Sequence, residues 1–368
     1  MMSSVDRDRR FMKLALIEAR KGLGRTSPNP VVGAVVVRDD QVVAKGYHRR
    51  AGAPHAEAEA LSKAGAAARG GTVYVTLEPC NHHGRTPPCT EKIIECGIRR
   101  VVVGMRDPNP LVAGGGNDYL AGRGIEVVSG VLEEDCLALN KPFLKHVQTG
   151  LPWVTMKAGV SIDGRIAART GHSQWISGES ARRRVHRLRD MYDAILVGSG
   201  TVLADNPSLT TRLPFGKGRD PLRVVLDSNL RTPPDAVLLT QKSDARTWIF
   251  CRDGADAGKK KCLEAAGAVV RQVKTDGDGF LALPDILLEL GRQNVNSLLV
   301  EGGGRVHASF LKQRLYDQAC LFVAPLFIGS EGLPVVGALG LDTVDQGVRF
   351  TTTRVRRLGE DVMIEGLF

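Results

Sequence analysis

Apolar and polar positions alternate in short blocks through the first 150 residues. Runs of β-branched residues predict strands, and segments rich in Ala, Leu and Glu predict helices. The predicted strands cover residues 32–38, 42–47, 72–77 and 100–104. The predicted helices cover residues 7–21 and 55–68, with another ending at residue 97 and a last strand and closing helix within 125–147. Strands that alternate with helices indicate an α/β layered domain.

A second series of strands begins after the Thr-Gly-Leu-Pro segment at 149–152, which predicts a domain boundary. Strands are predicted at 153–158, 194–197, 222–227, 247–251, 268–272, 297–300, 318–323 and 348–355, and a terminal hairpin reaches residue 368. Helices are predicted between several of them, at 178–191 and 284–292. We therefore expect two α/β domains, 1–149 and 150–368, each large enough for its own core.

The net charge of +10 is divided evenly between the two predicted domains. An evenly spread positive charge favours small anionic substrates such as phosphate esters, whereas nucleic-acid binders more often concentrate it on one element. No run of about 18 apolar residues occurs, and the charged N-terminus does not resemble a signal peptide. The seven cysteines are scattered and odd in number, unlike a disulfide framework. These features predict a cytoplasmic protein.

The sharpest chemical pattern combines His55 and Glu57 with Cys80 and Cys89. One imidazole and two thiolates form a three-ligand zinc site and leave the fourth position for water. Zinc in such a site lowers the pKa of that water toward neutrality and so supplies hydroxide. Glu57 is placed to accept the proton and deliver it to a departing amine. His55 and Cys89 each precede or open a predicted helix, where a thiolate is favoured.

His-x-Glu alone is weak evidence, because most such histidines are surface or core residues. With Pro-Cys following between a strand and a helix, it is typical of zinc-dependent base deaminases. The departure is the spacing, since eight residues separate Cys80 from Cys89 where two are usual. The alternatives are a structural zinc or free thiols. The remaining cysteines are expected to be small core residues: Cys96, Cys136, Cys251, Cys262 and Cys320.

The spacer between the two cysteines contains His82, His83 and Arg85. Either histidine could compete as a metal ligand. We expect instead that the three side chains face the substrate, with Arg85 suited to a phosphate by the fork geometry of its guanidinium. The other possibility is an ordinary solvated loop.

The second predicted domain has two glycine turns between a strand and a helix, at 198–201 and 301–305. Backbone amides in such turns can bind phosphate, and two turns could hold both ends of a dinucleotide. The dinucleotide fingerprint of the doubly wound fold is absent, because His307 stands where its third glycine would fall. A plain tight turn is the alternative for each.

The motifs of both halves resemble the bifunctional deaminase–reductase family of riboflavin biosynthesis, in order and over nearly the whole chain. In the first half they are TSPNPVVG (26–33), PHAE (54–57), LEPCNHHGRTPPC (77–89) and DPNPLVAG (107–114). In the second half they are KAGVSIDG (157–164), SQWI (173–176), TVLADNPSLT (201–210) and VEGGG (300–304). The long cysteine spacer is that family's own form.

The resemblance implies a three-layer cytidine-deaminase-like domain followed by a dihydrofolate-reductase-like domain that uses NADPH. It implies two consecutive steps: deamination of 2,5-diamino-6-ribosylamino-4(3H)-pyrimidinone 5′-phosphate, then reduction of its ribosyl group to ribityl. Lys157 and Asp205 are candidates for proton transfer in the second step. The family tends to form homo-oligomers. Residues implied in NADP binding are Gly159, Trp175, Thr201, Asp205, Ser228, Gly303, Gly304, Arg305, Val306, His307, Ala308 and Ser309. Residues implied in substrate binding are Asn29, His48, Lys157, Ser173, Arg189, Leu209, Arg212 and Glu301.

Two other functions share some of these features. A nucleic-acid base deaminase with an RNA-binding C-terminal half would have the same zinc motif, but it predicts a concentrated basic surface and aromatic stacking platforms. Aromatic residues make up only 5% of the chain, which argues against it. A non-enzymatic scaffold is the second alternative, and the intact metal and acid–base residues argue against that.

Overall fold

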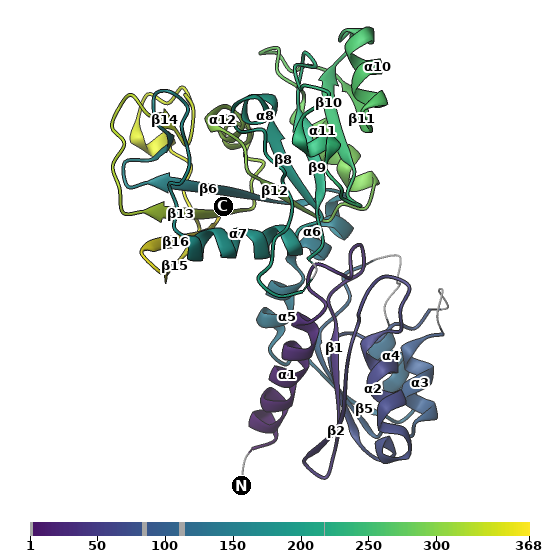
Figure 1. Ribbon diagram of the computed structural model, residues 1–368. Helices are drawn as coiled ribbons and strands as arrows, with labels where there is room; N and C mark the ends of the chain where they lie inside the picture. The colour runs from purple at the N-terminus through teal and green to yellow at the C-terminus, as the bar shows by residue number, and fades with distance from the viewer. Residues whose placement is uncertain (1–2, 83–86, 110–114, 217) are drawn as a thin grey trace. The chain divides into compact units, whose positions relative to one another are not determined.

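The computed structural model describes residues 3–82, 87–109, 115–216 and 218–368. The chain divides into two compact units, Met1–Gly150 and Leu151–Phe368, and each has its own sheet and hydrophobic core (Figure 1). Within the described parts of the chain, no helix is both long and apolar enough to cross a membrane.

The first unit is a five-stranded sheet with helices on both faces. The strand order is β2-β1-β3-β4-β5, with β1 antiparallel to its two neighbours and β3, β4 and β5 parallel. Helices α1 and α5 pack on one face, and α2, α3 and α4 cover the other (Figure 1). The strands are β1 (Gly33–Arg38), β2 (Gln41–Tyr47), β3 (Thr72–Leu77), β4 (Arg100–Met105) and β5 (Glu126–Ser129). The helices are α1 (Ser4–Arg20), α2 (Ala56–Ala64), α3 (Cys89–Glu95), α4 (Gly116–Gly122), α5 (Glu133–Leu139) and α6 (Lys141–Thr149).

Two strand glycines let the helices approach this sheet closely. A Cβ atom on Gly33 would lie 2.1 Å from the carbonyl oxygen of Ala15 in α1. A Cβ on Gly46 would lie 2.4 Å from the carbonyl oxygen of Ala56 in α2. Both distances are far inside van der Waals contact, so any side chain there would displace a helix. Helix α2 begins at the predicted zinc site. Its position therefore depends on the absence of a side chain at Gly46 in β2.

A buried ion pair connects α1 to the centre of the sheet. The Arg100 guanidinium donates to both oxygens of the Asp8 carboxylate at 2.7 and 2.9 Å, and Tyr74 Oη donates to Asp8 at 3.0 Å. Burial raises the pKa of Asp8, but these hydrogen bonds outweigh it and hold that pKa below its usual value. The stabilisation from this carboxylate is therefore present above the ordinary carboxyl pKa and is lost as pH falls through the lowered value.

The second unit is built on a nine-stranded sheet in the order β11-β10-β9-β8-β12-β6-β13-β16-β15. It is parallel from β11 to β13, and the β15–β16 hairpin adds antiparallel strands at one edge. Its strands are β6 (Trp153–Ser161), β8 (Ala194–Gly198), β9 (Leu222–Leu226), β10 (Thr247–Arg252), β11 (Ala268–Val273), β12 (Ser297–Val300), β13 (Gln318–Ala324), β15 (Thr352–Leu358) and β16 (Asp361–Leu367). A separate pair consists of β7 (Arg165–Ala167) and β14 (Leu333–Pro334).

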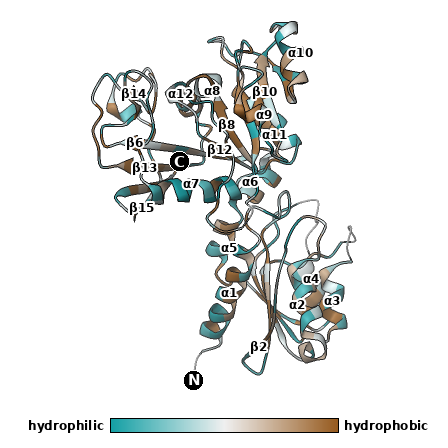
Figure 2. Cartoon of the chain, in the orientation of Figure 1, coloured by the Kyte–Doolittle hydropathy of each residue, from teal (hydrophilic) through white to brown (hydrophobic). Residues whose placement is uncertain are grey.

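Alternate residues of the central strand β12 face different helices. Leu298 and Val300 belong to the core cluster under α11 and α12, whereas Leu299 packs with α7 on the other face. The central strand β8 is brown in Figure 2, while α7 is mostly teal and contributes only a narrow apolar stripe. The helices of this unit are α7 (Glu179–Met191), α8 (Ser199–Asp205), α9 (Val237–Thr240), α10 (Ala257–Ala265), α11 (Leu283–Arg292) and α12 (Gly304–Lys312).

The structure corrects several predicted boundaries. The helix predicted at 55–68 ends at Ala64, because Gly65 adopts a φ of 54° and a 3-10 turn follows. The single closing helix is two helices, α5 and α6, that meet at Asn140. The strand predicted at 348–355 begins at Thr352 and continues to Leu358. The short helices α4, α8 and α10 were not predicted as such.

Arg100→Met tests the buried ion pair. It leaves the Asp8 carboxylate without its cation, so we expect the free energy of opening of β3 and β4 to fall by about 3–5 kcal/mol. Hydrogen exchange of the backbone amides in these strands, in the full chain, measures this value. Glu126→Gln is the control, because it removes the exposed partner of the same guanidinium and should cost at most about 1 kcal/mol. Equal losses in the two variants would contradict the role assigned to Asp8.

Candidate functional site

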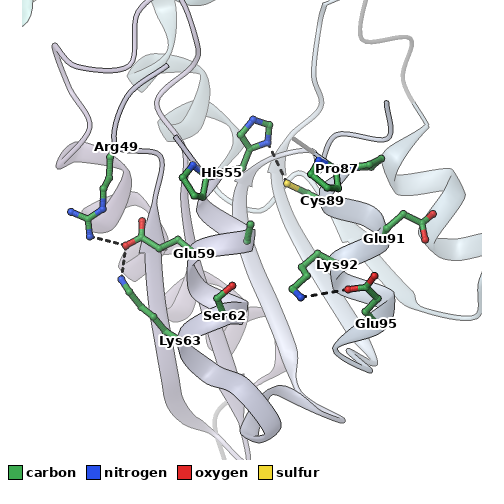
Figure 3. A pocket seen from close by; sticks show the side chains of 13 residues that line it. Arg49, His55, Glu59, Ser62, Lys63, Pro87, Cys89, Glu91, Lys92 and Glu95 are labelled. Atoms are coloured by element: carbon green, nitrogen blue, oxygen red, sulfur yellow. Dashed lines mark hydrogen bonds and ion pairs between the residues drawn. The ribbon is translucent and has the colours of Figure 1, made fainter. Parts of the chain in front are cut away.

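Three side chains in the first unit form a metal-ligand cluster. The ligand atoms of His55, Cys80 and Cys89 all lie within 4.8 Å of one another. His55 Nδ1 is 3.4 Å from Cys80 Sγ and 3.3 Å from Cys89 Sγ. Figure 3 shows the imidazole pointing at the Cys89 sulfur. One nitrogen and two sulfurs at this spacing fit zinc, with room for a further ligand.

Local structure explains why these residues meet. His55 is the N-cap of α2, Cys89 is the first residue of α3, and Cys80 follows the end of β3. The backbone N–H of Cys89 donates to Cys80 Sγ at 3.4 Å. Hydrogen bonds from Cys89 and from His55 hold the pKa of the Cys80 thiol well below its usual value. The site therefore favours a thiolate, which is the form that binds a metal.

Glu57 lies in the first turn of α2 and is only 3% exposed. Burial raises the pKa of its carboxyl group to about 7. A carboxyl group with a pKa near neutrality can both accept and deliver a proton at physiological pH. Glu57 therefore combines the chemistry and the location of an acid–base residue beside the cluster.

His48 and Asn29 form a hydrogen-bonded pair behind the metal ligands. His48 Nδ1 lies 3.1 Å from the Pro54 carbonyl oxygen, so this nitrogen carries the proton. His48 Nε2 then accepts from Asn29 Nδ2 at 3.0 Å. The His48 and His55 rings meet edge to face, with centroids 5.4 Å apart. His48 therefore orients the segment that leads into His55, and both of its ring nitrogens have protein partners.

A second polar connection lies next to Cys80. Glu78 is buried, and its two carboxylate oxygens accept from the backbone N–H groups of Asn117 and Asp107 at 3.0 and 3.3 Å. These bonds tie the ends of β3 and β4 and the start of α4 together. No role was predicted for Glu78, although its place two residues before a metal ligand was a usable signal.

The structure describes only part of the spacer between Cys80 and Cys89. His82 is exposed and is not part of the metal-ligand cluster found among the described residues. His83 and Arg85 lie outside the described residues, as does the second half of the DPNPLVAG motif.

A cleft of about 660 Å³ opens beside His55 and Cys89, between α2 and α3 (Figure 3). Its charged lining is largely paired: Arg49 and Lys63 both contact the Glu59 carboxylate, and Lys92 lies 3.4 Å from Glu95. Its walls therefore present few unpaired charges.

The second unit contains a buried charge cluster at the end of β12. Glu301 accepts from Arg189 at 2.8 and 2.9 Å and from Lys157 Nζ at 3.2 Å. Burial raises the pKa of Glu301, but Arg189 and Lys157 outweigh it and hold that pKa well below its usual range. One carboxylate with two cations leaves this cluster with a net positive charge, which suits an anionic substrate.

The two glycine turns lie side by side at the carboxyl ends of the neighbouring parallel strands β8 and β12. A Cβ atom on Gly303 would lie 3.9 Å from Thr201 Oγ1. Ser228 follows the next strand, β9, and Arg231 Nη2 donates to Ser199 Oγ at 3.0 Å in the same region. Turns and hydroxyl groups at this edge of a parallel sheet fit a dinucleotide phosphate.

The other residues implied by the resemblance divide into accessible and buried groups. Trp175 is 67% exposed, and Ser173 Oγ donates to Asp205 at 3.3 Å. His307 is fully buried. Its ring Nδ1 pairs with Tyr316 Oη at 2.7 Å, and its backbone N–H donates to the Gly303 carbonyl oxygen. The side chains of Ala308 and Leu209 are also in the core. In the 303–309 turn the side chains of His307 and Ala308 therefore pack in the core, and the role of this turn in NADP binding remains a prediction.

Comparisons with known proteins cover both units. The "Cytidine and deoxycytidylate deaminase zinc-binding region" model matches residues 5–105, and the "RibD C-terminal domain" model matches residues 152–364. The riboflavin biosynthesis protein RibD of Bacillus amyloliquefaciens is 43% identical over 97% of this chain and 95% of its own length. That of Escherichia coli is 40% identical over 97% and 98%.

Solved structures agree over the full length. The diaminohydroxyphosphoribosylaminopyrimidine deaminase/5-amino-6-(5-phosphoribosylamino)uracil reductase of Thermotoga maritima aligns with a TM-score of 0.87, at 38% identity over 99% of both chains. RibD of Acinetobacter baumannii aligns with a TM-score of 0.88, at 35% identity over 99% of both chains.

These matches confirm the α/β fold class with a cytidine-deaminase-like first part and a reductase second part. They also confirm zinc and NADPH as cofactors and do not favour the RNA-binding alternative. The chain belongs to the RibD family of bifunctional enzymes, which perform a deaminase and a reductase step of riboflavin biosynthesis.

Proposed function

We propose that this chain performs two consecutive steps on one phosphorylated pyrimidine, one in each unit. The first removes the 2-amino group of 2,5-diamino-6-ribosylamino-4(3H)-pyrimidinone 5′-phosphate. The second reduces the ribosyl group to ribityl with NADPH. The observation that supports this most directly is the buried Glu57 beside His55, Cys80 and Cys89, in a unit separate from the Glu301 charge cluster.

In the first step, His55, Cys80 and Cys89 would hold zinc, which supplies Lewis acidity and lowers the pKa of water at its fourth position. Glu57 takes the proton from the attacking water and gives it to the departing amine. The ring carbon gains an oxygen, its bond to the exocyclic nitrogen breaks, and ammonia leaves. Because Glu57 is buried, no bulk water competes for that proton.

In the second step, NADPH supplies the hydride, which adds to C1′ of the ring-opened ribosyl group. The adjoining nitrogen needs a proton, and Lys157 is the candidate donor because Glu301 holds its ammonium group in place. Arg212 is suited to the substrate phosphate: within the described residues its guanidinium has no hydrogen-bond or ion-pair partner. Gly159, Trp175, Thr201, Asp205, Ser228 and the start of the 303–309 turn would hold the cofactor.

Glu57→Gln separates the two steps. The amide cannot shuttle a proton, so ammonia release from the diamino substrate should fall by about 10²–10⁴-fold. Zinc content should be unchanged by elemental analysis, because Glu57 is not among the three ligands. NADPH oxidation should remain at the wild-type rate when the deaminated compound is supplied. Full deaminase activity in this variant would refute the proton-shuttle role, and a parallel loss of reduction would refute the division between units.

Cys89→Ala and Cys96→Ala form a matched pair that tests the metal site. Both thiols are free and lie at opposite ends of α3, but only Cys89 is in the cluster. Cys89→Ala should lose the bound zinc and the deaminase activity, whereas Cys96→Ala should retain both. Zinc retention in Cys89→Ala would remove this residue from the ligand set.

We also infer that the chain forms a homo-oligomer through the edge strand β15. Six of its seven residues are exposed, including the apolar Val355 at 62%. An exposed strand at the edge of a sheet is a template for pairing with another strand, and a second copy offers the same edge.

We further propose that the protein is cytoplasmic, because its seven cysteines form no disulfide, as expected in a reducing compartment.

Val355→Asp tests this interface. The charge should reduce the mass measured by analytical ultracentrifugation from oligomer to monomer. Val5→Asp is the control, because Val5 is equally exposed at 63% but lies on α1 in the first unit. A monomeric wild-type protein, or an equal effect of the two variants, would rule out β15 as the interface.

A further inference from the structure

One face of α7 holds the chain segment that includes Arg212. Three hydrogen bonds link them. The backbone N–H of Arg212 donates to His186 Nδ1 at 3.2 Å, and Arg189 Nη1 donates to the Thr210 carbonyl oxygen at 3.2 Å. The backbone N–H of Arg219 donates to the Asp190 carboxylate at 2.8 Å. Residues 186, 189 and 190 are three and four positions apart, so they share one helix face. Thr210, Arg212 and Arg219 therefore lie against this face of α7.

The two ends of this segment are also joined to each other, and we call this junction its base. Thr211 N–H donates to the Asp220 carboxylate at 2.7 Å, and Thr211 Oγ1 donates to the Arg219 carbonyl at 2.8 Å. A Cβ atom on Gly218 would lie 2.4 Å from the Thr211 side chain, so the two ends of the segment are in close contact. Phe215, beyond this base, is 89% exposed. Arg212 is the first residue past the base, and its backbone N–H is held by His186 Nδ1.

We infer that His186 is a positioning residue for the reductase step: its Nδ1 fixes the backbone of Arg212 and thereby aims that guanidinium at the substrate phosphate. The inference rests on the phosphate-binding role proposed above for Arg212. His186 acts on the substrate only through Arg212.

The charges around position 186 explain why a neutral acceptor is needed there. The charged groups that face it are Arg189 on its own helix, Arg212, and Glu301 at the end of β12, and the ring also has a backbone hydrogen bond with Thr210. Burial, with Arg189 and Arg212, lowers the pKa of His186 to about 4, so the ring is uncharged at physiological pH with a lone pair on Nδ1. Lysine or arginine could not accept the N–H. A carboxylate would pair with the nearby guanidinium groups and oppose the substrate phosphate.

His186→Leu and His186→Asn test this inference in the full-length zinc-loaded protein. Leucine cannot accept the Arg212 N–H, whereas the asparagine Oδ1 occupies nearly the position of Nδ1 and can. We expect His186→Leu to raise KM for the deaminated, phosphorylated substrate by about tenfold, which corresponds to one lost hydrogen bond of about 1.4 kcal/mol. The reductase kcat should change by less than about twofold, as expected for uniform binding. His186→Asn should recover most of the affinity.

Four measurements separate positioning from damage to the fold, the last of them in a double variant. Deaminase activity and the dissociation constant of NADPH should be unchanged in both variants. The effect of His186→Leu should disappear with substrate that lacks the 5′-phosphate, and it should disappear in an Arg212→Met background. An unchanged KM in His186→Leu, or an asparagine variant as impaired as the leucine variant, would overturn the inference.

The same experiment distinguishes failure of the inference from failure of the proposed function. If Arg212→Met itself leaves KM for the phosphorylated substrate unchanged, the phosphate role of Arg212 is wrong. If Arg212→Met raises KM but His186→Leu does not, only the role of His186 is wrong.

Discussion

Parallel strands deliver their carboxyl ends to one edge of a sheet, and both sites of this protein depend on that constraint. In the first unit β3 ends just before Cys80, and Glu78 fastens that end to the end of β4. In the second unit β8, β9 and β12 end next to one another, which brings the two glycine turns and Ser228 together. The residues themselves are far apart in the sequence, and the sheet register brings them within reach of one small molecule.

Charge is handled differently at the two sites. The first concentrates ionisable groups, and burial or mutual hydrogen bonds set the protonation of Glu57 and Cys80 for chemistry. The second keeps its charges fixed: Glu301 stays ionised between Arg189 and Lys157, and His186 stays neutral beside Arg189 and Arg212. Fixed charges suit a step in which the cofactor supplies the reactive hydride and the protein mainly holds both molecules in place.

The metal-ligand cluster was predictable from the sequence because its signal is local. His55, Cys80 and Cys89 each adjoin the start of a helix or the end of a strand, and residue type with spacing is enough to propose the cluster. The charge cluster was reached only through the family resemblance, since a single Glu before three glycines has no distinctive spacing. The contact between His186 and Arg212 had no sequence signal at all, because it joins residues 26 positions apart through tertiary structure.

In the fold, too, the elements with a local sequence signal were predictable and the others were not. Strand runs were recognised because buried parallel strands are continuously apolar, whereas α8 and α4 are too short for a period of 3.6 residues to appear. The early end of α2 was indicated by Gly65, but a run of alanines around it concealed the break. His307 and Leu209 have side chains that pack in the core, so any contact of these two residues with a ligand would come from their backbone, and their predicted roles remain predictions.

The close approach at Gly46 has a consequence for how this enzyme tolerates genetic variation. The glycine lies in a strand away from the chemistry, yet a single methyl group there would collide with the backbone of α2, whose first turn presents His55 and Glu57. Because Ala56, Ala60 and Leu61 of α2 belong to the core of the first unit, the change would disturb both the packing of this helix and the alignment of the ligands. The second unit has a core of its own, so an inherited variant at this position would lose the deaminase half and keep the reductase half.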